Sequence, residues 1–216
     1  MLNKIYNKLK LIFIFNKFLI DVLIFKFSNI NISNNSFKFF HLIFFKTKGL
    51  SNKILHQILK SKKIKFSSKE NHDIFENLNF DDVDYKKLKK NGYSYHKSIV
   101  SKKITERIIE SSEVLNGLYS SDEYNSEKKE KLNQENLKAK KFAISSNDLI
   151  NIPEIQDIIV NPKILEIAQG YLGSAPILDI ISVSFSFPNK KNDSNAAQMW
   201  HIDLDRPKWV KFFIFL

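Results

Sequence analysis

Two side chains near the C-terminal end of the sequence have the types and the spacing that could bind a metal ion. His201 and Asp203 are separated by Ile202, within a segment (196–203) whose pattern predicts a β-strand. Side chains two residues apart on a strand lie on the same face, so the imidazole and the carboxylate would meet on one side. They supply two of the three ligands in the 2-His-1-carboxylate set that holds non-haem Fe(II). The other interpretation is a His–Asp pair on the protein surface.

The residues around this pair favour the metal-binding interpretation. The stretch Gln198–Arg206, followed by Lys208–Leu216, resembles the phytanoyl-CoA dioxygenase-like family. The shared features are an aromatic residue before His-x-Asp, a short charged turn and an aromatic-rich strand. The stretch Asn91–Tyr93 resembles the Gly-Tyr opening of that family, and Asn161–Gly173 resembles the helix before its first core strand. The resemblance covers residues 81–216.

The resemblance implies a fold, a cofactor and a set of site residues. The family consists of Fe(II)/2-oxoglutarate-dependent oxygenases on a double-stranded β-helix. By this resemblance His201 and Asp203 are iron ligands, and Gln198 contacts the co-substrate 2-oxoglutarate. The metal and 2-oxoglutarate carry the chemistry, and the protein supplies geometry and a shielded pocket. The expected activity is the oxidation, typically hydroxylation, of a small organic substrate.

The sequence departs from the family after Asp203. In the family, a second histidine ligand and an arginine that binds the far carboxylate of 2-oxoglutarate both follow His-x-Asp. Here residues 204–216 contain no histidine, and the other histidines all precede the pair, at His41, His56, His72 and His96. A jelly roll also needs eight strands, and the pattern predicts three or four. We therefore expect the N-terminal part of a longer oxygenase, inactive without the remainder.

The elements that would position the site are a mixture of helices and strands. Capping residues and apolar periodicity predict helices, whereas alternation and β-rich composition predict strands. The first predicted helix is capped by Asp81 or Asp82, runs to Lys90 and is closed by Asn91-Gly92. The other predicted helices are 102–119 after a Ser101 cap, and 162–172 between Asn161 and Gly173. The predicted strands are 93–95, 177–187, 196–203 and 209–216. The polar segment 120–141 is expected to be a surface helix or a loop. This order predicts an α+β fold, an incomplete double-stranded β-helix preceded by helices.

Positive charge is concentrated in the first third of the chain. Residues 1–65 contain 13 lysines, no arginine and one acid, Asp21, which gives +12, whereas the whole 216-residue chain carries +11. The lack of arginine and of an aromatic–basic platform in this region argues against a nucleic-acid partner. The chain has no cysteine, which excludes disulfides, thiolate metal sites and a cysteine nucleophile.

The same region is strongly apolar, which suggests a membrane surface. The stretch Leu9–Phe27 is long enough to span a bilayer. Its 14 Leu, Ile, Phe and Val residues favour insertion by about 6 kcal/mol, but Lys17 and Asp21 together cost about 6 kcal/mol. An amphipathic helix lying in the interface of an anionic membrane fits better. The alternatives are a helical hairpin packed on the rest of the fold, and a segment translated from a wrongly assigned start.

These observations divide the chain into two predicted parts. Residues 1–75 form a basic, apolar extension, and residues 76–216 form the oxygenase part. The expected location is the cytoplasm, with peripheral membrane contact through residues 1–65. The competing functional hypothesis is a non-enzymatic membrane-surface protein whose oxygenase domain has degenerated.

Overall fold

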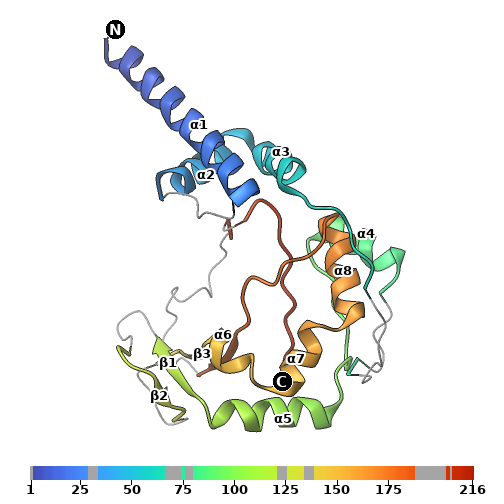
Figure 1. The fold of residues 1–216 in the computed structure, drawn as a ribbon. Coiled ribbons are helices and arrows are strands. Elements are labelled where there is room, and N and C mark those ends of the chain that lie inside the picture. Colours follow the sequence, from blue (N-terminus) through green and yellow to red (C-terminus); the bar gives the residue numbers. More distant parts are fainter. Residues whose placement is uncertain are drawn as a thin grey trace. The chain divides into compact units, whose positions relative to one another are not determined.

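The structure, a computed structural model, describes residues 2–28, 34–66, 74–75, 80–120, 126–133, 139–187, 203–204 and 206–216. Three helices come first within these residues: α1 (Leu2–Ser28), α2 (Asn34–Thr47) and α3 (Leu50–Leu59) (Figure 1). The elements that follow are α4 (Asp82–Asn91), α5 (Lys102–Glu113), β1 (Asn116–Ser120), β2 (Glu130–Lys131), β3 (Lys141–Ile144), α6 (Ser146–Leu149), α7 (Pro153–Ile159), α8 (Pro162–Leu172) and β4 (Val183–Ser186).

The four strands form one antiparallel sheet in the order β2-β1-β3-β4. Tyr119 of β1 lies opposite Phe142 of β3, and Phe142 in turn lies opposite Phe185 of β4. Helices combined with an antiparallel sheet confirm the predicted α+β class. A jelly roll consists of two sheets, and the described residues form one. The finer prediction, an incomplete double-stranded β-helix, is therefore not confirmed.

The chain folds into two compact units. The first contains Met1–Ser61 together with Asp203–Trp209, and the second contains Lys62–Ile202 together with Val210–Leu216. The border predicted between residues 75 and 76 was based on composition and stays a prediction.

In the first unit, α1 lies against α2, and α2 against α3 (Figure 1). Aromatic and aliphatic side chains of the three helices form its core. The buried members are Phe18, Val22, Phe39, Phe40 and Leu55. The rings of Phe18 and Phe39 lie 5.5 Å apart between centroids. The Ser36 hydroxyl donates to the Asp21 carboxylate over 2.5 Å. α1 and α2 thus form a helical hairpin, and the one acid of residues 1–65 is hydrogen-bonded where the two helices meet.

In the second unit, the core joins β1 and β3 to α5, α6 and α7. Its buried members are Ile108, Tyr119, Ala139, Phe142, Ile144, Leu149, Ile152 and Ile155. Phe142 and Leu149 have no exposed surface. The Tyr119 ring packs against Phe142 at 4.8 Å, and its hydroxyl donates to the Lys131 carbonyl over 2.8 Å. The polar end of this buried tyrosine is therefore satisfied, as burial requires.

Capping residues at their N-termini and glycines at their C-termini determine where α4 and α8 begin and end. The Asp81 carboxylate accepts two backbone N–H groups of the first turn of α4, at 2.8 and 3.0 Å, and Gly92 ends that helix with φ 82°. The Asn161 side chain caps α8, Pro162 is its first residue, and Gly173 ends it with φ 73°. Both glycines adopt the left-handed conformation that favours glycine. The structure confirms these predicted boundaries.

The predicted limits of α5 are only partly right. The helix begins directly after Ser101, as predicted, but it ends at Glu113 and β1 begins at Asn116. The prediction that the helix continues to Tyr119 is wrong because residues 116–120 pair with β2 and β3 instead. Leu118, which lies within the range predicted as helix, is 44% exposed on the strand.

Several predicted strands are also wrong. Neither Tyr93–Tyr95 nor Trp209–Leu216 is a strand, and within residues 177–187 the strand is confined to β4. The alternation of β4 is as predicted, with Val183 and Phe185 half-buried and Ser184 and Ser186 exposed. Segment 120–141 contains the last residue of β1, the whole of β2 and the first residue of β3, while residues 121–125 and 134–138 lie outside the described residues. Most of the predicted strand 196–203 also lies outside them.

α4 and α8 approach each other closely at Gly170. A Cβ atom added to Gly170 would lie 2.4 Å from the Tyr85 oxygen and 2.6 Å from the ring carbon that bears it. The Tyr85 hydroxyl donates to the Glu166 carbonyl over 3.1 Å, and its ring meets Phe80 edge to face at 4.6 Å. Glycine therefore leaves the space that the Tyr85 ring occupies on α8.

Candidate functional site

Of the three predicted site residues, the structure describes Asp203. His201 and Gln198 lie outside the described residues, so the predicted pairing of His201 with Asp203 stays a prediction. Asp203 is half-buried and the next residue, Leu204, is 7% exposed. Both belong to the compact unit that contains α1, α2 and α3. A half-buried carboxylate is partly shielded from water, which strengthens its attraction for a cation.

The described histidines do not assemble a metal centre. His41 of α2 lies against the rings of Phe37 and Phe40, at 4.6 and 5.8 Å between centroids. The His96 ring nitrogen lies 3.0 Å from the Ser94 hydroxyl. Among the residues that the structure describes, no three His, Asp or Glu side chains lie close enough to hold a metal ion. The described residues therefore do not fit a complete iron site.

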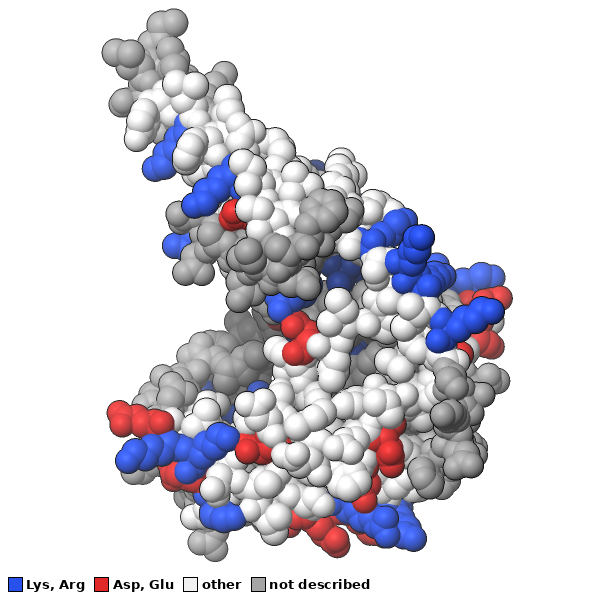
Figure 2. All heavy atoms as spheres, viewed as in Figure 1, with Lys and Arg blue, Asp and Glu red and all other residues white. Residues whose placement is uncertain are grey.

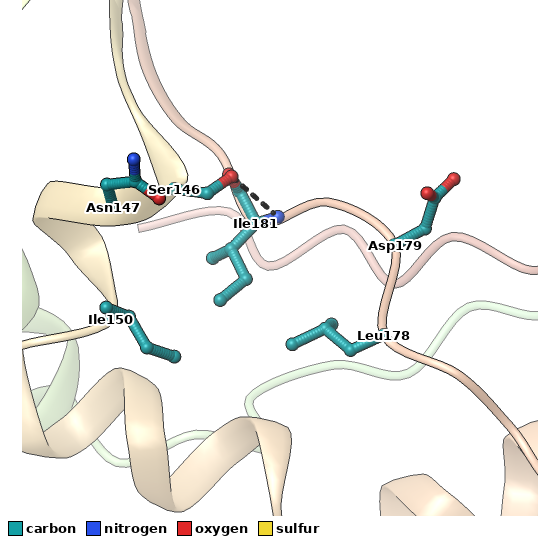
Figure 3. A pocket seen from close by; sticks show the side chains of 6 residues that line it. All are labelled: Ser146, Asn147, Ile150, Leu178, Asp179 and Ile181. Atoms are coloured by element: carbon teal, nitrogen blue, oxygen red, sulfur yellow. Dashed lines mark hydrogen bonds between the residues drawn. The ribbon is translucent and has the colours of Figure 1, made fainter. Parts of the chain in front are cut away.

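A small hollow lies between α6 and the segment before β4 (Figure 3). Its volume is about 200 Å³, and it is lined by Ser146, Asn147, Ile150, Leu178, Asp179 and Ile181. The Ser146 hydroxyl donates to the Ile181 carbonyl over 2.7 Å. The aliphatic side chains converge, while the Asp179 carboxylate points away from them (Figure 3). Ligand pockets usually have about 300–1,000 Å³, so this hollow is too small for an organic substrate together with 2-oxoglutarate.

A polar cluster joins Lys129, Ser145 and Asp148. The Lys129 ammonium and the Ser145 hydroxyl each donate to the same Asp148 oxygen over 2.6 Å, and Lys129 lies 3.3 Å from the Ser145 oxygen. Hydrogen bonds from Lys129 and then Ser145 lower the pKa of Asp148 below its usual 3.8. A carboxylate with a lowered pKa is a weak base, so it does not activate the serine as a nucleophile. The cluster instead links Lys129 to the first turn of α6.

The sequence contained the signal for this cluster. Ser145 and Asp148 have the S-x-x-D spacing that marks a helix start. Lys129 comes from a distant segment, and its contact with Asp148 depends on the folding of residues 126–133 beside α6.

Tyr85 is the second group with a shifted pKa. Burial, reinforced by the negative charges of Glu166 and Asp82, raises the pKa of its phenol above 10. The phenol therefore stays protonated and continues to donate to the Glu166 carbonyl. This is a packing role between α4 and α8, and it supplies no acid or base near neutral pH.

Comparison with known proteins yields no relative. No protein-family model, no curated protein and no solved structure matches the chain at a significant level.

Among the described residues, no helix combines the length and the apolar character needed to cross a membrane.

Proposed function

We propose that the chain is part of an Fe(II)/2-oxoglutarate-dependent oxygenase of the phytanoyl-CoA dioxygenase type. The observation that carries the proposal is the stretch Gln198–Arg206, in which an aromatic residue, His201 and Asp203 are followed by a charged turn. The helix α8, capped at Asn161 and closed at Gly173, and the antiparallel sheet that β4 joins are compatible with it. The proposed fold is an incomplete double-stranded β-helix, and the proposed substrate is a small organic molecule.

The proposed roles follow from the chemistry of the side chains. His201 provides a neutral ring nitrogen and Asp203 a carboxylate oxygen, both suited to Fe(II). Gln198 provides amide groups that can hydrogen-bond 2-oxoglutarate. Iron and 2-oxoglutarate, when bound, couple oxidative decarboxylation of the co-substrate to oxidation of the substrate. The triad needs one more histidine, and residues 204–216 contain none.

Binding of Fe(II) to this 216-residue chain tests the proposal. We expect weak binding in an anaerobic calorimetric titration, because two protein ligands hold the ion less firmly than three. His201→Ala and Asp203→Ala should each abolish it. His96→Ala is the matched control, since that imidazole lies beside Ser94, away from the proposed pair in sequence, and should leave binding unchanged.

A second measurement separates iron binding from turnover. Added 2-oxoglutarate should give the visible charge-transfer band of its Fe(II) chelate in the wild-type chain and not in the two ligand variants. We expect no succinate formation, because residues 204–216 supply no second histidine ligand. Iron binding that survives both ligand substitutions would refute the site, and the competing hypothesis of a non-enzymatic membrane-surface protein would replace it.

A further inference from the structure

α1 has two apolar faces, and one of them packs against α2 and α3. Phe18 and Val22 form the packed face, each 3% exposed. Successive residues of a helix are rotated by about 100°, which places Leu9, Phe13 and Ile20 on the opposite side. These three side chains are 61%, 71% and 55% exposed. We call this exposed face the outer stripe of α1; its members are Tyr6, Leu9, Ile12, Phe13, Ile20 and Leu23.

The outer stripe, which includes the exposed polar side chain of Asn16, is a largely apolar surface of the kind that marks an interaction site. Its six members are all at least 50% exposed and follow one side of a 27-residue helix. Soluble monomers seldom expose contiguous apolar patches of several large side chains without a function for them. Figure 2 shows uncharged surface along much of α1, interrupted by lysines. Such a stripe favours contact with another apolar surface.

The charges beside the stripe identify the surface that covers it. Lys10 and Lys17 are exposed and lie along one border of the stripe, by the same rotation of 100° per residue. Asp21, the one acid of residues 1–65, instead accepts a hydrogen bond from Ser36 on α2. An antiparallel pairing with a second copy of this chain would bring two such lysine borders together. An anionic lipid surface attracts them, at about 1 kcal/mol for each lysine near the surface.

We propose that α1 lies flat on an anionic lipid bilayer, with its outer stripe inserted among the acyl chains and its lysines among the headgroups. This goes beyond the proposed oxygenase function and does not depend on it. Interfacial helices bury their apolar face by about 5–10 Å, and α1, at 1.5 Å per residue, offers about 40 Å of length. The packed face stays on α2 and α3, so docking requires no unfolding of the first unit.

Sedimentation of the full chain with lipid vesicles tests this proposal. We expect binding to vesicles of equimolar phosphatidylcholine and phosphatidylserine, and little binding to phosphatidylcholine alone. Added salt should weaken binding, because it screens the attraction between lysines and headgroups. Equal binding to both kinds of vesicle, or binding that salt does not affect, would overturn the anionic part of the proposal.

Two pairs of variants distinguish vesicle binding through the outer stripe from nonspecific binding through other exposed residues. The triple change Leu9→Ser, Phe13→Ser and Ile20→Ser should reduce the partition coefficient about tenfold or more, because it removes inserted apolar area. The matched control, Ile177→Ser, Ile180→Ser and Phe215→Ser, changes side chains that are 89%, 72% and 87% exposed in the second unit, and should leave binding unchanged. Lys10→Glu with Lys17→Glu should cost about twentyfold or more, whereas Lys103→Glu with Lys128→Glu, also at exposed positions, should have little effect.

A labelling experiment keeps the proposal testable if a serine variant fails to fold. The sequence has no cysteine, so a single introduced cysteine can carry an environment-sensitive fluorophore. With the label attached through Phe13→Cys, its fluorescence emission should shift to shorter wavelength when anionic vesicles are added. With the label attached through Val114→Cys, a position that is 65% exposed in the second unit, the emission should stay unchanged. A blue shift on self-association without vesicles that is lost when Leu9→Ser and Ile20→Ser are added to the Phe13→Cys chain would assign the stripe to a second copy and overturn the proposal.

Discussion

Replacement of Gly170 by alanine tests the packing of α4 on α8, because two physical effects predict opposite signs. At an unobstructed helical position, alanine stabilises relative to glycine by about 0.5–1 kcal/mol. Here the new Cβ would lie 2.4–2.8 Å from three atoms of the Tyr85 side chain. Ordinary contacts begin near 3.4 Å, so the ring has to withdraw by about 1 Å, and overpacking of this kind costs about 1–3 kcal/mol.

Withdrawal of the ring also weakens two specific contacts. The hydrogen bond from the Tyr85 hydroxyl to the Glu166 carbonyl contributes about 0.5–1.5 kcal/mol. The edge-to-face contact with Phe80 contributes a similar amount. Because Tyr85 is only half-buried, the ring can move partly into solvent. The summed cost of overpacking and of the two weakened contacts therefore lies near the lower end of these ranges. We expect Gly170→Ala to lower the free energy of unfolding by about 1–2 kcal/mol after the helix-propensity gain is subtracted.

A double-mutant cycle followed by urea unfolding measures this effect. In a Tyr85→Ala background the obstruction is gone, so Gly170→Ala should stabilise by about 0.5–1 kcal/mol, which gives a coupling of about 2 kcal/mol. Gly173→Ala is the matched control on the same helix. Its cost comes from φ 73° and a Cβ there would meet no atom within 4 Å, so the cost should be equal in both backgrounds. If Gly170→Ala stabilises the wild-type chain, the Tyr85 ring does not lie on Gly170 and the argument fails.

Two further predictions concern the second unit. Phe142→Ala should lower the free energy of unfolding by about 3–5 kcal/mol in urea, because the ring is fully buried; Phe213→Ala, at a side chain 74% exposed, should change it by less than about 0.5 kcal/mol. If both substitutions lower the free energy of unfolding equally, Phe142 does not belong to the core of the second unit. For Asp148, carboxyl NMR titration should give a pKa below 3.8 that rises in Lys129→Ala. A lowered folded-state pKa contributes stability above the unfolded-state pKa, which is lost as the pH falls through the folded value. Asp148→Asn should therefore reduce the dependence of stability on pH below about pH 4. If the free energy of unfolding falls as steeply with acid in this variant as in the wild-type chain, the Lys129 contact is contradicted.

The sequence predicted those elements whose limits are determined by neighbouring residues. Asp81 and Asn161 accept hydrogen bonds from the first turns of their own helices, and Gly92 and Gly173 end the same helices. These interactions span a few residues, so they can be recognised without the rest of the fold. The alternation of Val183 and Phe185 with serines was recognised for the same reason.

Elements that depend on distant partners were missed. Asn116–Ser120 continues the apolar spacing of α5 and was predicted as helix, but pairing with β3 makes it a strand. Trp209–Leu216 has the composition of a strand, yet composition supplies no hydrogen-bonding partner, and the segment is not a strand. The candidate iron site also depends on residues that are distant in sequence. His-x-Asp supplies two ligands within three residues, and the third ligand must come from another part of the fold.

The two end strands of the described sheet differ in how they tolerate a neighbouring strand. β2 is two residues long, and both residues, Glu130 and Lys131, are charged and exposed. β4 is twice that length, carries no charge and alternates half-buried apolar residues with exposed serines. Short, charged edge strands resist pairing with a foreign strand, whereas longer uncharged ones accept it. Within the described sheet, strand addition and the aggregation that it causes are therefore more favourable at β4, whereas the charges of Glu130 and Lys131 disfavour strand addition at β2.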